Sequence, residues 1–148
     1  MSAAQVLALS GLPGESLRGA MQTSYGPVLD LVAGPTGTHV VIPPTPARLW
    51  LFGIAWEIKT TGGTISVAPS VQIGTNSPNF NNQFTTEAAA GFKTQAAETV
   101  LGPSAYVLPT QTSDLTSSGL IVNVTALATG SSPVLTARPL AIYILLPV

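Results

Sequence analysis

The sequence predicts an all-β fold: an antiparallel two-sheet β-sandwich, jelly-roll-like, with an extended N-terminal arm. Three observations support this prediction. From Tyr25 onward, apolar runs of strand length are separated by clusters of glycine and proline. Within several runs, apolar and polar side chains alternate with the period of a strand. The chain has 148 residues, which is long enough for one sandwich and too short for two domains of ordinary size.

The N-terminal segment differs from the rest of the chain. Ala3–Leu9 has room for only a short helix, because glycine and proline interrupt it at residues 11–14. We therefore assign residues 1–24 to an arm that is ordered only where something else holds it, with a frayed terminus as the equal alternative. Residues 25–148 form the predicted sandwich domain.

Strand candidates in the first half of the domain lie between clear breaks. Gly34–Gly37 is a hairpin-like break, and the prolines at positions 43, 44 and 46 forbid regular pairing. The triplet Thr61-Gly62-Gly63 is predicted to close the longest strand. The predicted strands are Pro27–Ala33, Thr38–Ile42, Arg48–Thr60 and Thr64–Ile73.

The second half contains a long polar connection and then further strands. Thr75–Gly91 is the connection, with a helical turn expected around Thr85–Ala90. A break at Gly130–Pro133 parts the two strongest strands, the last of which is apolar on both faces. The predicted strands are Lys93–Leu101, Ala105–Leu108, Leu120–Ala128 and Pro139–Leu146. The total of about eight strands is the number of a jelly roll.

Arg48–Thr60 is the most informative strand. Strict alternation gives one face Trp50, Phe52, Ile54, Trp56 and Ile58, and gives the other Leu49, Leu51, Gly53, Ala55, Glu57 and Lys59. A sandwich strand needs only one apolar face. The second apolar face, at Leu49 and Leu51, must then be covered by the arm, by a neighbouring subunit or by the chain's own loops. The residues that we predict for the core and for an oligomer interface are Leu49, Trp50, Leu51, Phe52 and Trp56.

The composition points to a chain whose surface is covered by partners. Hydrophobic residues make up 45% of the sequence and charged residues 7%, whereas about 25% of an ordinary domain is charged. The net charge is −1 with no basic patch, which argues against nucleic acid as a partner. No apolar stretch has the length of a membrane helix, and no secretory signal is visible. We therefore expect a chain that is made and folded in the cytoplasm.

Residues suited to catalysis are few. His39 is the only histidine, and a lone histidine in a short strand is more often structural than a base. Cysteine is absent, no two of the six acidic residues are close in sequence, and no Gly-x-Ser-x-Gly motif occurs. We predict no enzymatic activity, no cofactor and no metal. A hydrolase whose carboxylates meet only in the folded chain is the remaining catalytic alternative.

One polar segment is a candidate for surface recognition. Asn76–Gln83 gathers amide side chains around one aromatic ring, a combination that binds sugars in other proteins. The alternative, which we favour, is a loop whose amides satisfy its own backbone. The candidate recognition residues are Asn76, Asn79, Phe80, Asn81 and Asn82.

Residues 48–148 resemble the capsid decoration, or cement, proteins of tailed bacteriophages. The resemblance rests on the strand order and texture of WLFGIAWEIKTTGG, TISVAPSVQIGTNS and PNFNN, followed by LIVNVTALA and LAIYILLPV. It implies a jelly-roll-like sandwich that trimerises and binds between major capsid subunits on the virion surface. It carries no catalytic residue. A tail or baseplate component has the same low charge and β texture, and a carbohydrate- or receptor-binding module of a tail or head fibre is the alternative function.

Overall fold

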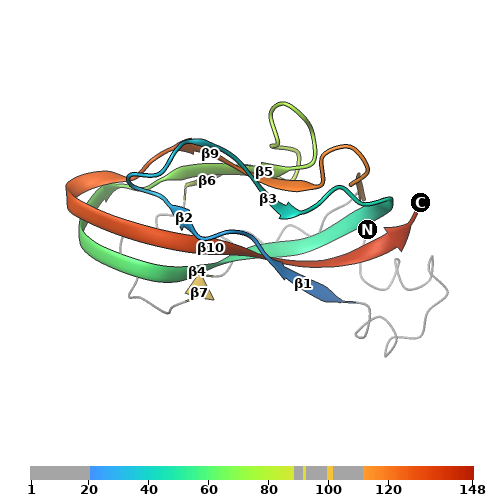
Figure 1. Ribbon diagram of the computed structural model, residues 1–148, viewed down its shortest axis with the longest axis horizontal. Helices are drawn as coiled ribbons and strands as arrows, with labels where there is room; N and C mark the ends of the chain where they lie inside the picture. The colour runs from blue at the N-terminus through green and yellow to red at the C-terminus, as the bar shows by residue number, and fades with distance from the viewer. Residues whose placement is uncertain (1–20, 89–91, 93–99, 102–111) are drawn as a thin grey trace.

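The computed structural model describes residues 21–88, 92, 100–101 and 112–148, and these form two antiparallel sheets packed face to face (Figure 1). Residues 1–20 of the predicted arm lie outside the described residues, whereas the sheet already includes Gln22–Ser24. The strands are β1 (Gln22–Tyr25), β2 (Leu29–Asp30), β3 (Gly37–Ile42), β4 (Ala47–Val67), β5 (Ser70–Gly74), β6 (Phe84–Ala88), β7 (Val100–Leu101), β8 (Ser113–Asp114), β9 (Leu120–Ala126) and β10 (Thr129–Pro147).

The order of the strands is that of a jelly roll. The first sheet has the order β1-β10-β4-β7, with β2 also paired to β10 and β8 to β4; the second has the order β3-β9-β5-β6. The pairs β1·β10, β3·β9, β4·β7 and β5·β6 are nested, as if one long hairpin had been wrapped into two layers. This topology confirms the predicted fold class.

Two long strands each continue through a position where the sequence predicted a break. β4 and β10 stay paired from Val67↔Thr129 to Ala47↔Pro147, and at one end the pair bends from the first layer towards the second (Figure 1). The turn predicted at Thr61–Gly63 and the break predicted at Gly130–Pro133 are therefore wrong. Both segments are bends within strands.

The bend depends on an irregular pairing between two glycine-containing segments. The register shifts between Ser131 and Val134, which is a β-bulge. Gly63 lies opposite with φ +63°, and a Cβ atom there would meet the carbonyl oxygen of Ser132. Because the bulge increases the local twist and glycine admits this backbone conformation, the ribbon turns the corner and its pairing resumes on the other side.

The other differences concern strand limits. Thr64–Ile73 divides into the end of β4 and the separate strand β5, and Pro27–Ala33 contains only the two-residue β2. The structure has β6 at Phe84–Ala88, where we predicted a helical turn, so that prediction is wrong. The limits predicted for β3 and β9 agree closely with the structure.

A second bulge changes which side chains of β4 face the core. Leu51 pairs with Tyr143 and Gly53 with Ile142, so Phe52 is an extra residue in β4. The alternation inverts at this point. The assignment of Trp50 and Trp56 to one face is therefore wrong, and so is the inference that Leu49 and Leu51 lie on a face outside the core.

The main core lies between the two sheets. Leu49 and Leu51 enter it before the bulge, and Ile54, Trp56 and Ile58 enter it after the bulge. The opposite sheet contributes Val71, Ile73, Leu120, Val122 and Val124. In the described part of the chain, every buried side-chain nitrogen and oxygen has a hydrogen-bond partner. The described residues therefore form one buried apolar core between the sheets, without an unsatisfied polar side-chain atom.

Candidate interaction surfaces

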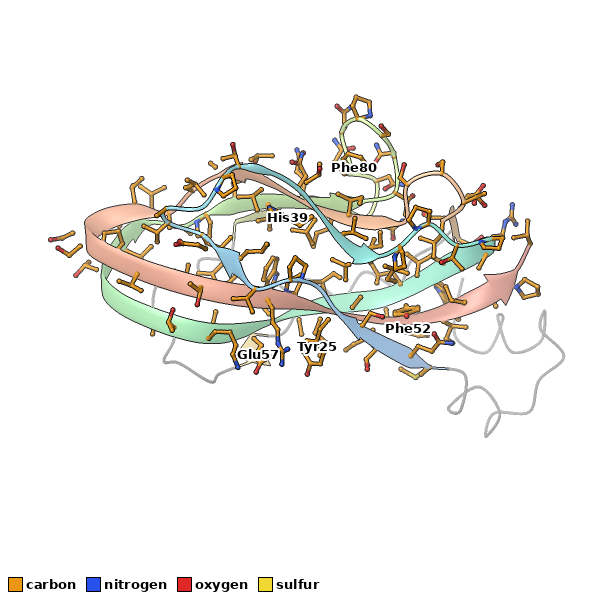
Figure 2. All side chains as sticks on the ribbon, in the orientation of Figure 1. Tyr25, His39, Phe52, Glu57 and Phe80 are labelled. Atoms are coloured by element: carbon orange, nitrogen blue, oxygen red, sulfur yellow. The ribbon has the colours of Figure 1, made fainter. Side chains whose placement is uncertain are left out.

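The outer face of the β1-β10-β4 sheet is rich in apolar side chains. Trp50 and Ile144 are each 1% exposed and form a second buried cluster, separate from the main core, and Phe52 and Leu146 pack against it half-buried. The rings of Trp50 and Phe52 lie 4.9 Å apart between centroids, tilted by 42°. Figure 2 shows Phe52 on the side of this sheet that faces away from the other layer.

The same apolar face continues along β10. By strand alternation Leu140 and Ile142 point outward with Ile144, and both are half-buried. A strand that is apolar on both faces is the sequence signal for such a surface. β10 carries that signal, although the sequence reasoning placed the interface on β4 alone.

The five predicted core and interface residues divide between two environments. Leu49, Leu51 and Trp56 lie in the main core, where the Trp56 ring makes an edge-on contact with Phe92 at 5.4 Å between centroids. Trp50 and Phe52 lie on the other side of the sheet, where Trp50 is buried in the second cluster and Phe52 is half-buried against it. Contact of any of them with another chain remains a prediction.

An ionic cluster adjoins this apolar surface. The Glu57 carboxylate accepts hydrogen bonds from Lys59 Nζ at 3.0 Å and from Arg138 Nε, and the Arg138 guanidinium lies 3.9 Å from the centre of the Tyr25 ring. Figure 2 places Tyr25 and Glu57 on the same side of the molecule as Phe52. Tyrosine and arginine are frequent in the energetically dominant parts of protein interfaces, and sequence reasoning did not single out this cluster.

The cluster predicts a measurable acid dependence. Arg138 first, and then Lys59, lower the pKa of Glu57 from its ordinary value of 4.5. Because the pKa of Glu57 is lower in the folded chain than in the unfolded chain, the ionised carboxylate stabilises the fold at pH values above its ordinary pKa. This stability is lost as the pH falls through the lowered pKa of the folded chain. We expect Glu57→Gln to unfold more easily than the wild type at neutral pH. The difference should vanish in acid, measured by urea unfolding across pH 2–7.

Salt provides the control for this prediction. Side chains of Glu57 and Arg138 are partly exposed, so at about 1 M salt, where the Debye length is about 3 Å, the difference should shrink. If Glu57→Gln and the wild type differ in unfolding free energy by the same amount at both ends of the pH range, the ionised carboxylate does not have this role.

The asparagine-rich loop projects from the second sheet between β5 and β6 (Figure 1). Asn76 Oδ1 accepts hydrogen bonds from the backbone N–H groups of Asn81 (2.7 Å) and Asn82 (3.0 Å), and Asn76 Nδ2 donates to Asn81 Oδ1. Asn82 Oδ1 accepts from the N–H of Thr75, while Asn82 Nδ2 donates to the Thr75 hydroxyl. The amides thus hold the loop in its own conformation.

Two predicted members of this loop have other positions. Asn79 is exposed and Phe80 is half-buried. Phe80 has a positive φ of 49° and its backbone N–H donates to the carbonyl of Asn76. The recognition role predicted for these residues stays a prediction, whereas the alternative of amides that bond within the loop describes Asn76, Asn81 and Asn82.

We expect Asn76→Ala to loosen this loop. The change leaves two backbone N–H groups without their acceptor, at a cost of about 1–2 kcal/mol for partly exposed groups. Hydrogen exchange at the amides of Asn81 and Asn82 should accelerate roughly tenfold, while exchange in β9 stays unchanged. Asn79→Ala is the matched control and should leave both rates as they are; equal acceleration by both variants would contradict this account.

In the described stretches, no three acidic, histidine or cysteine side chains gather as metal ligands would, and no helix is long and apolar enough to cross a membrane.

Comparison with known proteins gives a structural match and no sequence match. No family model and no curated protein is similar in sequence to this chain. A chain of a solved structure described as the cyanophage Pam1 capsid asymmetric unit is similar in fold, with a TM-score of 0.53 at 13% identity. The match covers 86% of this chain and 85% of that one. At this identity the likeness concerns the fold, which extends over most of both chains.

Proposed function

We propose that this protein is a structural component of a virus particle, a capsid decoration protein that binds between major capsid subunits and stabilises the shell. The observation that carries the proposal is the row of half-buried apolar side chains on the outer face of the β1-β10-β4 sheet, which lies outside the main core between the sheets. The similarity in fold to a chain of a phage capsid unit supports the same proposal.

The mechanism is the burial of this outer face. Phe52, Leu140, Ile142 and Leu146 are all half-buried within the single chain. Fully burying one such side chain contributes roughly 1.5–3 kcal/mol relative to leaving it exposed, so each retains part of that amount for contact with another chain. We propose that sister copies form a closed homo-oligomer, with a trimer as the expected number, and that this oligomer presents several equivalent contacts to the capsid.

Several weak contacts then act together. Once one subunit of a trimer is bound, its neighbours are held at high effective concentration near their own sites. Residues 1–24 are the proposed arm: Gln22–Ser24 belong to β1, and residues 1–20, outside the described part of the chain, are proposed to reach adjacent capsid subunits. A crack in the shell would have to break these added contacts as well.

The carbohydrate-binding alternative has less support. Three of the four asparagines proposed for recognition use their side chains to hold the loop, which leaves fewer amide groups to bind a sugar.

Two measurements test the proposal. Light scattering on the purified full-length chain at micromolar concentration should give the mass of a trimer or of another closed oligomer. Peptide mass spectrometry of purified virus particles that encode this sequence should find the chain in a fixed ratio to the major capsid protein. A chain found only in the soluble fraction of infected cells, and absent from the particles, would overturn the proposal.

A further inference from the structure

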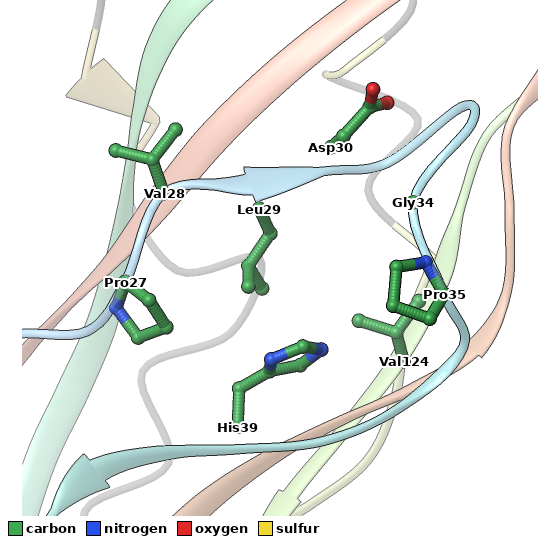
Figure 3. A pocket seen from close by; sticks show the side chains of 8 residues that line it. All are labelled: Pro27, Val28, Leu29, Asp30, Gly34, Pro35, His39 and Val124. Atoms are coloured by element: carbon green, nitrogen blue, oxygen red, sulfur yellow. The ribbon is translucent and has the colours of Figure 1, made fainter.

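A small pocket opens between the edges of the two sheets, at the connection from β2 to β3 (Figure 3). Its volume is about 160 Å³. The residues that line it are Pro27, Val28, Leu29, Asp30, Gly34, Pro35, His39 and Val124. It lies at the open edge of the sandwich and involves neither the apolar outer face nor the asparagine-rich loop.

The walls of this pocket are fixed before anything binds. Asp30 Oδ1 accepts hydrogen bonds from the backbone N–H groups of Val32 and Ala33, both at 2.9 Å, and so holds the turn that leads to Pro35. Leu29 and Val124 are buried, and two proline rings have no rotamer freedom to lose. A ligand therefore needs little ordering of the protein, which favours binding by small groups.

His39 is the polar side chain that turns into this space. Figure 3 shows its ring and the Leu29 side chain pointing toward one another from β3 and β2, whereas the Asp30 carboxylate points away. His39 is half-buried, and within the described part of the chain its imidazole has no hydrogen bond to protein. An imidazole can donate or accept one such bond at each nitrogen.

Size and chemistry together select the ligand. An engineered protein cavity of about 150 Å³ with aliphatic and aromatic walls binds benzene, so this pocket has room for one six-membered ring. A sugar would lose the hydration of several hydroxyl groups and find a single side-chain partner, which is unfavourable. A flat apolar ring with one hydroxyl group matches both the walls and His39.

We propose that this pocket binds a phenol ring, namely the tyrosine side chain of a neighbouring chain in the assembly. The inference that the ring comes from a neighbouring chain rests on the proposed function, because a virion protein is surrounded by other chains. The affinity of the pocket for a phenol ring is independent of that function and can be measured on the isolated protein.

The full-length protein is suited to this test because it has one histidine. The ring C–H signals of His39 are therefore unambiguous in a ¹H–¹³C NMR spectrum. N-acetyl-tyrosinamide should shift them saturably, with millimolar affinity. N-acetyl-phenylalaninamide lacks only the hydroxyl group and should bind roughly fivefold more weakly, which corresponds to one neutral hydrogen bond. No shift with either probe would overturn the proposal.

Two variants assign the binding to the pocket, with saturation transfer on the probe signals as the readout. His39→Ala should bind both probes with equal affinity, because it cannot distinguish the hydroxyl group. Val40→Ala is the matched control: Val40 is the next residue of β3 and is 50% exposed, and this variant should keep the fivefold preference. A preference that survives in His39→Ala would overturn the proposed role of His39. Binding of p-cresol without binding of N-acetyl-tyrosinamide would overturn the proposal that the ring belongs to a peptide chain. The proposed virion function would not be affected by that result, because it has separate tests.

Discussion

Trp56→Ala is expected to lower the free energy of unfolding by about 3–5 kcal/mol, since it removes the largest class of side chain from a closed core. Trp56 is 1% exposed and packs edge-on against Phe92. A loss of this size is a large part of the roughly 5–15 kcal/mol that stabilises a typical domain. Urea unfolding followed by far-UV circular dichroism measures it.

Two further variants keep this prediction testable if Trp56→Ala does not fold. Trp56→Phe keeps an aromatic ring beside Phe92 and should lose less. Phe52 is partly exposed on the outer face, so Phe52→Ala should cost the single chain less than Trp56→Ala. Similar losses for Phe52→Ala and Trp56→Ala would contradict the bulge, because strict alternation places both residues on one face.

Phe52→Asp is expected to separate the oligomer into folded single chains. The proposed contact would have to bury a carboxylate without a partner, which costs more than the lost apolar contact alone. We expect the dissociation constant to rise at least tenfold, equivalent to about 1.4 kcal/mol, as measured by sedimentation at several concentrations. The melting curve of the dissociated chain should stay cooperative.

Val67→Asp controls for the added charge. Val67 is 58% exposed and lies at the far end of β4, beyond the bend. This variant should keep the mass of the wild-type oligomer. If Val67→Asp dissociates the oligomer and Phe52→Asp does not, the interface lies on another surface.

The fold class could be predicted because its signals are local. β9 has Leu120, Val122 and Val124 on one face, and in the structure these side chains fill the core. Apolar runs, their period and the proline breaks each depend on neighbouring residues only, which is sufficient for a two-sheet sandwich.

The position of the outer apolar face could not be predicted from β4 by itself. The bulge at Phe52 exists because β4 and β10 pair with a shifted register, and residues distant in sequence determine that shift. One extra residue moves every later side chain to the opposite face. For this reason Leu49 and Leu51 lie in the main core, while Trp50 and Phe52 belong to the second cluster on the other side of the sheet.

The two bends and the candidate pocket were missed for related reasons. Glycine clusters mark turns, but they also mark bulges where a strand bends, as between Gly63 and Ser132. Sequence reasoning treated them as the ends of strands. The pocket joins Pro27 and His39 to Val124, which come from three strands or loops far apart in the sequence, so only the folded chain brings them together.

Cryo-electron microscopy of the native virus particle tests the central claim most directly. We expect density for this jelly roll on the capsid shell, with the half-buried side chains Phe52, Ile142 and Leu146 of the β1-β10-β4 sheet buried against another chain. Particles whose shell lacks this density, or in which the sandwich is present with those side chains open to solvent, would contradict it.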